Sequence, residues 1–202
     1  MWRPASTHEG EEALLCDALD PADEAELLIL APRHPDRGDA LADMLDARGL
    51  AFARRSIGEA PLSAHKVLLA DTLGEMGLWL RLSRMAFIGG SWVDGVGGHN
   101  PVEAARLATP MAVGPYTANF TTLYNDLEAA GGCARVRTTD ELRTALNTVF
   151  SDVTRGRRYA DAAIGVVDAA TAAWPKTLDA LEALWTQRRT EDAEMTEAGA
   201  DA

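Results

Sequence analysis

The sequence has only two cysteines, Cys16 and Cys133, and they lie far apart in the chain. Such a pair gives neither a disulfide framework nor the ligand spacing of a zinc site, so we expect reduced thiols in a cytoplasmic protein. The four histidines show no His-x-x-x-His spacing. We therefore expect no metal site and no cofactor.

Three well-known motifs are also missing. No Gly-x-Ser-x-Gly turn marks a hydrolase nucleophile. No Gly-Lys-Ser/Thr ends a Walker loop, and no Gly-x-Gly-x-x-Gly fingerprint opens a first βα unit. The sequence is therefore not that of a Walker-type nucleotide hydrolase or a common dinucleotide-binding protein.

Positive charge is scarce, with 19 Lys and Arg against 31 Asp and Glu and a formal net charge of −12. This balance argues against non-specific binding to nucleic acid or to anionic membrane surfaces. No apolar run reaches the ~18 residues of a membrane span, and the first residues lack the apolar core of a signal peptide. Instead, 202 residues with 47% hydrophobic content fit one globular domain.

Short apolar runs alternate with helical patterns along the chain, which predicts an α/β fold with a doubly wound parallel sheet. The expected strands are residues 2–5, 27–31, 50–53, 67–70, 85–88, 110–113 and 133–136, and the expected helices are residues 9–19, 36–48, 73–84, 100–108 and 119–130, followed by helices over residues 139–189. Residues 190–202 are acidic and aperiodic, so a disordered tail is expected after a domain of residues 1–189. A strand that begins at residue 2 is typical of a fragment of a longer chain.

The glycine-rich segment 89–103 is the strongest functional signal. It follows an apolar strand and leads to Asn100 as an expected N-cap and Pro101 as the first helical residue. A strand, a glycine-rich loop and a helix start form a site for an anion, since backbone N–H groups can approach the ligand there. Glu103, one turn into the helix, could accept hydrogen bonds from sugar hydroxyls. The alternative is a flexible surface loop.

Arg33 follows the strand at residues 27–31 and lies between two prolines, beside His34. Because ligands bind beyond the carboxyl ends of parallel strands, Arg33 is a candidate partner for a phosphate or a base. A solvated loop arginine explains the same pattern, and His34 fits a role in shaping the loop.

The segment Asp71-Thr72-Leu73-Gly74-Glu75 follows another strand. Asp71 or Thr72 could cap the next helix, with Glu75 completing a capping box. Alternatively, the backbone of residues 73–75 meets a nucleotide at the helix start. Both interpretations remain open on local grounds.

Ser6 and Thr7 are expected to cap an acidic helix start, which explains the hydroxyls and carboxylates there but not His8 and Gly10.

Together these stretches resemble the 3-deoxy-D-manno-octulosonic acid (Kdo) transferases. The resemblance rests on five ordered motifs over about residues 2–180, namely Ala-Ser-Thr-His-x-Gly-Glu-Glu (5–12), Pro-Arg-His-Pro (32–35), Asp-Thr-x-Gly-Glu (71–75), Gly-Gly-Ser-x-Val…Gly-Gly-His-Asn-Pro-x-Glu (89–103) and Gly-Pro-x-Thr-x-Asn-Phe (114–120). Leu73, Trp92 and Val102 depart from the common residues of that family but remove no polar group.

The resemblance implies the C-terminal, donor-binding half of a GT-B glycosyltransferase, with a Rossmann-like sheet. It implies that CMP is bound by Pro32, Arg33, Leu73, Gly74, Glu75, Asn100, Pro101, Val102 and Glu103, and that Ser6, His8, Gly98 and His99 lie nearer the Kdo group. Such enzymes move Kdo from CMP-Kdo to a lipid A precursor (lipid IVA) at the cytoplasmic face of the inner membrane, with inversion and without a metal. Their catalytic base is a Glu of the N-terminal domain. We therefore expect no catalytic residue in this chain, and we do not expect the chain alone to transfer Kdo.

Two other classes stay open. One is a UDP-sugar transferase or epimerase of the same fold, and the other is a non-catalytic nucleotide-binding or interaction module. Trp174 and Trp185 are expected to face the surface left by the missing domain, where they would favour self-association.

Overall fold

A computed structural model describes the chain except residues 21–25, 173 and 201–202. It divides into two units, Met1–Val167 and Asp168–Ala202, and each is considered by itself. No helix in the described part of the chain combines the length and the apolar character of a membrane-crossing segment.

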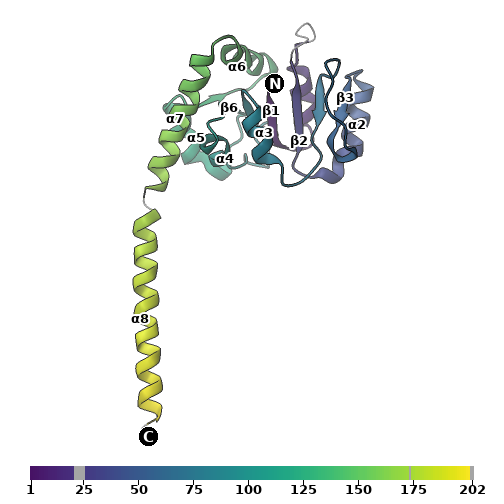
Figure 1. Cartoon of the computed structure of the whole chain (residues 1–202). Coiled ribbons are helices and arrows are strands. Elements are labelled where there is room, and N and C mark those ends of the chain that lie inside the picture. The colour runs from purple at the N-terminus through teal and green to yellow at the C-terminus, as the bar shows by residue number, and fades with distance from the viewer. Residues whose placement is uncertain (21–25, 173, 201–202) are drawn as a thin grey trace. The chain divides into compact units, whose positions relative to one another are not determined.

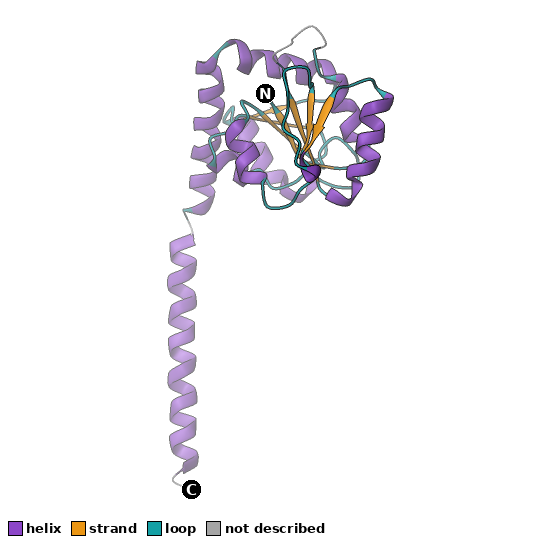
Figure 2. Ribbon diagram, turned by 45° about the vertical axis from the view of Figure 1, so that its right-hand side comes forward, coloured by secondary structure: helices purple, strands orange, loops and turns teal. Residues whose placement is uncertain are grey.

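The first unit is built on a parallel sheet that has seven strands among the described residues (Figures 1 and 2). Its strands are β1 (Arg3–Thr7), β2 (Leu28–Pro32), β3 (Phe52–Arg54), β4 (Val67–Leu69), β5 (Ala86–Ile88), β6 (Met111–Val113) and β7 (Cys133–Arg135), in the order β3-β4-β2-β1-β5-β6-β7. The fully buried strands are nearly continuous apolar runs, as expected for a sheet covered on both faces.

Helices cover both faces of this sheet (Figure 2). Helices α1 (Glu11–Asp17), α2 (Gly38–Ala47) and α6 (Thr139–Ser151) pack on one face, and α3 (Met76–Leu82), α4 (Val102–Arg106), α5 (Thr121–Ala129) and α7 (Val153–Thr171) pack on the other. Short 3-10 turns are η1 (Pro35–Arg37), η2 (Arg55–Ile57) and η3 (Ala118–Phe120). Strand β2 shows the alternation of side chains directly. Leu28 and Leu30 pack on the face covered by α1, α2 and α6, whereas Ile29 and Ala31 pack on the opposite face with Trp79 of α3.

The middle of the sheet holds the point where the strand order reverses. The chain builds β2, β3 and β4 to one side of β1, then returns to place β5 on the other side and continues through β6 to β7. Strands β1 and β5 pair in register, with Ala5 opposite Ile88. A crevice for ligands is expected beyond the carboxyl ends of such a pair.

The predicted doubly wound α/β fold is confirmed, and each expected strand is present within one or two residues. Three predicted helix starts were wrong. Helix α1 has Gly10 as its N-cap in place of Ser6 or Thr7, α3 begins at Met76, and α4 begins one residue later than expected, with Pro101 as its N-cap. The buried glutamates of α1 and the side-chain pairing before α3, described below, explain the first two shifts.

The described part of the second unit consists of the end of α7 and a further helix, α8 (Trp174–Ala200). The compact first unit ends at Val167, before the predicted boundary at residue 189. Helix α8 also continues through most of the segment predicted as a disordered tail, of which residues 201–202 lie outside the described part. The tail was expected from its low apolar content, but its Ala and Glu residues also have high helix propensity.

Gly114, directly after β6, makes the closest backbone contact of this region. A Cβ there would collide with the Ser91 carbonyl of the loop after β5. The Gly114 N–H also donates a hydrogen bond to Ser91 Oγ at 2.9 Å, which holds the two loops together. We expect Gly114→Ala to lower the free energy of unfolding by about 2 kcal/mol, because one of the two loops must move. Gly165→Ala is the control, since Gly165 lies within α7 with open space around it and should gain about 0.5–1 kcal/mol. Urea unfolding measures both, and equal stability of Gly114→Ala and the native chain would contradict the contact.

Candidate functional site

Two adjoining cavities lie at the carboxyl ends of the central strands. The larger, about 170 Å³, is lined by Ser6, Ala31, Pro32, Arg33, Ala70, Thr72, Leu73, Gly74, Met76 and Trp79. The smaller, about 50 Å³, is lined by Ser6, Met76, Leu80, Ile88, His99, Asn100, Glu103 and Ala104. Ser6 and Met76 line both cavities, which therefore adjoin where the strand order reverses; together they are called the crevice.

Most of the site residues expected from the sequence line this crevice. Pro32, Arg33, Leu73 and Gly74 line the larger cavity, and Asn100, Glu103 and His99 line the smaller one. Val102 lies with Glu103 in a neighbouring groove between α3 and α4, and Pro101 and Gly98 are buried beside the crevice. Glu75 lines neither cavity. The three segments that carry these residues are thus brought together, although up to about 70 positions separate them in the chain.

Some of the lining residues were missed by sequence reasoning, and three of them come from one stretch of the chain. Thr72, Met76 and Trp79 belong to the segment before α3 and to its first turn. Trp79 is buried, yet it also forms part of the cavity wall. Thr72 lies within the Asp-Thr-x-Gly-Glu motif and the other two follow it closely, which is the signal that could have found them.

Glu103 and Arg33 are the charged side chains that remain free in the crevice. Both are exposed, and the Glu103 carboxylate and the Arg33 guanidinium make no hydrogen bond or ion pair within the described chain. The Arg33 backbone is fixed, because its N–H donates to Thr7 O at 2.9 Å. A free acceptor thus lines the smaller cavity and a free cation lines the larger one, as a ligand with hydroxyls and an anionic group requires.

The segment before α3 is fixed by ion pairs and not by helix capping. Burial opposes ionisation of Asp71, but hydrogen bonds from Arg54 and Ser56 outweigh it and lower the pKa of Asp71. Hydrogen bonds from Arg55 and Thr72 lower the pKa of Glu75 to about 2. The predicted capping roles of Asp71, Thr72 and Glu75 were therefore wrong, because these side chains tie η2 to the wall of the larger cavity instead.

The glycine-rich loop is held by hydrogen bonds to other parts of the fold, which does not fit the alternative of a flexible surface loop. Asn119 donates to Val96 O at 2.7 Å, and Tyr124 Oη donates to His99 O at 2.6 Å. The Gly98 N–H donates to Gly90 O at 2.7 Å. Asn100, one residue before the N-cap of α4, accepts from Val102 N at 2.9 Å. The loop after β6 and helix α5 thus hold residues 96–100 in place beside the crevice.

His8 and His99 meet at the same edge. Their Nε2 atoms are 2.8 Å apart, and their rings stack with centroids 5.0 Å apart. One nitrogen must donate and the other accept, so the pair is neutral or singly charged when this bond is formed. Burial lowers the pKa of His99 to about 4, and nearby His8 and Arg33 act in the same direction. The pKa of His8 is lowered by burial as well.

This shift makes stability depend on pH. An unfolded His99 takes up a proton near pH 6.5, whereas the folded one remains neutral down to about pH 4. Between pH 6.5 and 4 the unfolded chain therefore binds a proton that the folded chain does not. The free energy of unfolding is highest above pH 6.5 and decreases as the pH falls from 6.5 to 4. Because His99 is half-buried, we expect His99→Gln to remove about 1–2 kcal/mol of this pH dependence. Urea unfolding across this range measures it, with His65→Gln in the loop before β4 as control. An unchanged slope in His99→Gln would contradict the shift.

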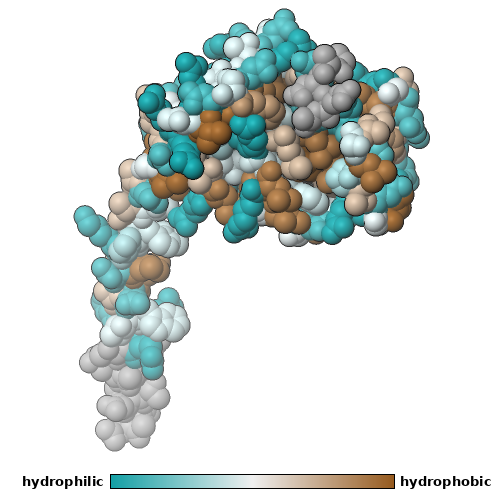
Figure 3. Space-filling view, turned by 45° about the horizontal axis from the view of Figure 1, so that its top comes forward, coloured by the Kyte–Doolittle hydropathy of each residue, from teal (hydrophilic) through white to brown (hydrophobic). Residues whose placement is uncertain are grey.

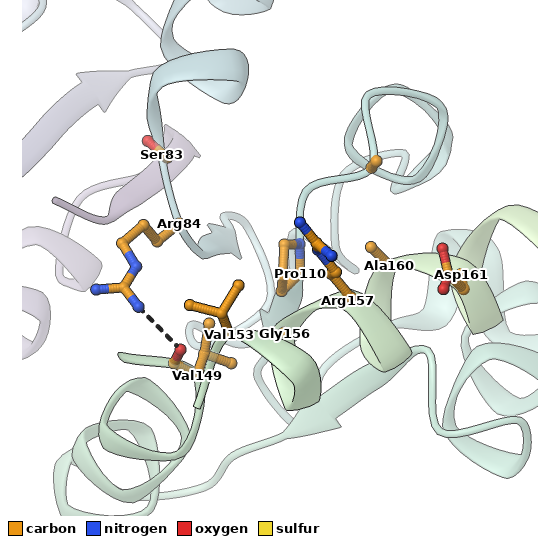
Figure 4. A pocket seen from close by; sticks show the side chains of 10 residues that line it. Ser83, Arg84, Pro110, Val149, Val153, Gly156, Arg157, Ala160 and Asp161 are labelled. Atoms are coloured by element: carbon orange, nitrogen blue, oxygen red, sulfur yellow. Dashed lines mark hydrogen bonds between the residues drawn. The ribbon is translucent and has the colours of Figure 1, made fainter. Parts of the chain in front are cut away.

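A larger cavity, about 450 Å³, lies at the opposite ends of the strands (Figure 4). It is lined by residues that precede β5 and β6 and by α6 and α7. Its Arg84 donates to the carbonyls of Val149 and Phe150 and lies 4.9 Å from the centre of the Phe150 ring. Arg84 therefore closes the end of α6, and none of the sequence motifs falls on this cavity.

Known proteins resemble this chain over most of its length. A 3-deoxy-D-manno-octulosonic acid transferase from Bordetella pertussis is 40% identical over 188 residues, which cover 88% of this chain and 43% of that protein. The transferase of the same name from Haemophilus influenzae is 34% identical over 186 residues, covering 90% of this chain and 43% of that protein. No protein-family model matches the chain.

A solved structure of a domain from the same kind of protein also resembles this chain. The crystal structure of the C-terminal CMP-Kdo binding domain of WaaA from Acinetobacter baumannii matches with a TM-score of 0.79 and 30% identity, over 82% of this chain and 88% of that one. The chain spans less than half the length of the two transferases, and this match is to one domain. The chain therefore belongs to the 3-deoxy-D-manno-octulosonic acid transferase family, with the Rossmann-like fold of one half of a GT-B glycosyltransferase.

Proposed function

We propose that this chain is the donor-binding domain of a Kdo transferase and that it binds CMP-Kdo in the crevice formed by the two cavities. The observation that carries the proposal is that three of the family motifs, far apart in sequence, line one crevice at the reversal of strand order. The A. baumannii domain described above as binding CMP-Kdo has the same fold.

The lining residues suggest how the nucleotide lies. Pro32, Leu73 and Trp79 give the larger cavity apolar walls against which a flat base can lie, and backbone groups at Gly74 can approach its edge. Glu103 then accepts from the ribose hydroxyls. Arg33 compensates the negative charge that develops on the CMP phosphate as the sugar leaves. His8, Ser6, Gly98 and His99 border the place left for Kdo.

In the complete enzyme, we propose that a carboxylate of another domain removes the proton of the acceptor hydroxyl. That oxygen attacks the anomeric carbon with inversion, and CMP leaves with its phosphate held in this crevice. Glu75 does not take the role of the base, because its low pKa and its bonds to Arg55 and Thr72 make it a poor proton acceptor. The acceptor, a lipid A precursor at the cytoplasmic face of the inner membrane, would be held by the N-terminal domain.

Calorimetric titration of the 202-residue chain with CMP and UDP tests this function. We expect weak binding of CMP, weaker binding of UDP and no transfer of Kdo by this chain alone. Tighter binding of UDP would favour the UDP-sugar enzymes of the same fold. Absence of CMP binding at millimolar concentration would contradict the proposal, and turnover by the chain alone would contradict the role given to another domain.

Helix α8 is proposed as a contact surface. Trp174, Leu178, Leu181 and Trp185 recur at helical spacing and are each about half exposed or more. Hydrophobic side chains lie among hydrophilic ones along this helix (Figure 3). We expect the chain to self-associate through them, with a concentration-dependent mass in sedimentation equilibrium that the double variant Trp174→Ser, Trp185→Ser abolishes. A monomeric native chain at the highest concentrations would contradict this expectation.

A further inference from the structure

Glu11 is a carboxylate that the sequence presents as an ordinary acidic residue of a first helical turn. In the structure it is fully buried, and its oxygens accept four backbone N–H groups. The Oε2 atom accepts from His8 at 3.0 Å and from Gly90 at 2.8 Å. The Oε1 atom accepts from Ser91 at 3.0 Å and from Trp92 at 2.8 Å.

These four donors come from two segments about 80 positions apart. His8 belongs to the turn between β1 and α1, and residues 90–92 open the loop between β5 and α4. These are the two segments that border the reversal of strand order. Glu11 therefore sets how the turn and the glycine-rich loop lie relative to each other, which neither segment does by its own local hydrogen bonds.

The chemistry of this contact requires a carboxylate. Each oxygen accepts two N–H groups, and a carboxylate has lone pairs for all four. A glutamine would keep one accepting oxygen and present an NH₂ group to two N–H donors. That substitution turns two hydrogen bonds into donor–donor contacts at a buried position, where lost hydrogen bonds are most costly.

We propose that Glu11 is a positioning residue of the donor site, which holds His8 against His99 and keeps the glycine-rich loop in the conformation that a nucleotide sugar requires. This inference rests on the function proposed above. The Gly90 N–H bonded to Glu11 is joined through Gly90 O to the Gly98 N–H, next to His99. His99 in turn lines the smaller cavity. A shift of the loop would thus move His99 and Asn100 away from the ligand and break the contact between the two histidines.

Glu12 is a matched control for Glu11. It is the next residue in α1 and is equally buried, but it accepts from Thr7 Oγ1 at 3.0 Å and pairs with Arg37 at 2.6 Å. Within the described part of the chain, no side-chain partner of Glu12 lies in the glycine-rich loop. Both Glu11→Gln and Glu12→Gln are expected to lower the unfolding temperature, because each removes a buried charge from its partners. Only Glu11→Gln should change the site.

The experiment compares these variants by CMP titration, thermal unfolding and ¹⁵N NMR of the histidine side chains. We expect Glu11→Gln to bind CMP at least tenfold more weakly and to change the ring-nitrogen signals of His8 and His99, while Glu12→Gln retains native affinity and native signals. If Glu11→Gln does not fold, Glu11→Asp replaces it, with a smaller change in the same direction expected because its carboxylate is one CH₂ shorter.

Two outcomes would overturn the proposal. One is native affinity and native histidine signals in a folded Glu11 variant, and the other is an equal loss in Glu12→Gln. If the native chain does not bind CMP, the proposed function fails. The histidine signals then still decide whether Glu11 holds the pair together.

Discussion

Replacing Glu103 by alanine is expected to weaken CMP binding about a hundredfold. The carboxylate is free of partners in the described chain and lines the smaller cavity. Two hydrogen bonds from ribose hydroxyls to a charged acceptor, at about 1.5 kcal/mol each, account for this factor. Because the side chain is exposed and unpaired, the substitution should leave the unfolding temperature nearly unchanged. Isothermal titration with CMP measures the affinity.

Two controls separate the role of the carboxylate from a general charge effect. Glu103→Gln keeps the shape and one accepting oxygen, so its loss should be intermediate. Asp46→Asn removes one negative charge from the exposed face of α2, away from the crevice, and should bind CMP like the native chain. Native affinity in Glu103→Ala would remove Glu103 from the site.

Replacing Arg33 by alanine is expected to weaken CMP binding by about tenfold or more, because a charge-assisted hydrogen bond to an anion contributes about 1.5–3 kcal/mol. Its backbone N–H remains bonded to Thr7 O, so the loop itself should keep its place. The loss should shrink at high salt, since an exposed ion pair is screened. Titrations at low and high salt measure both effects.

Arg157→Ala is the matched control for Arg33. Arg157 lines the cavity at the opposite ends of the strands, and its guanidinium is drawn in Figure 4. The two variants lose the same charge from different cavities. If Arg157→Ala weakened CMP binding and Arg33→Ala did not, the ligand would lie in the larger cavity of Figure 4 and the assignment of the crevice would be wrong.

The strands could be predicted from sequence because each one is a short apolar run bounded by turn residues. Residues 85–88 and 110–113 show this most plainly, since β5 and β6 differ from them by one residue. Helix starts were harder to predict. Thr72 and Glu75 have the composition of a capping box, yet Glu75 bonds to Arg55, a residue 20 positions away that no local pattern reveals.

The candidate site was accessible to sequence reasoning where a charged residue directly follows a strand, as Arg33 does, or lies at a helix start after a glycine-rich loop, as Glu103 does. It was not accessible where apolar residues serve both core and cavity, as Met76 and Trp79 do. The partners of Glu11 were also beyond reach, because its three donors in the glycine-rich loop lie about 80 positions away and are brought near it by the pairing of β1 with β5.

The most direct test of the account is to map CMP binding by backbone amide NMR shifts of the ¹⁵N-labelled chain. We expect shifts concentrated in residues 31–33, 72–76 and 98–104, the segments that contribute most to the lining of the two adjoining cavities. Residues 153–161, around the cavity of Figure 4, should remain unchanged. Shifts concentrated in that second region, or none at millimolar CMP, would contradict the central claim that the crevice at the carboxyl ends of the central strands holds the nucleotide.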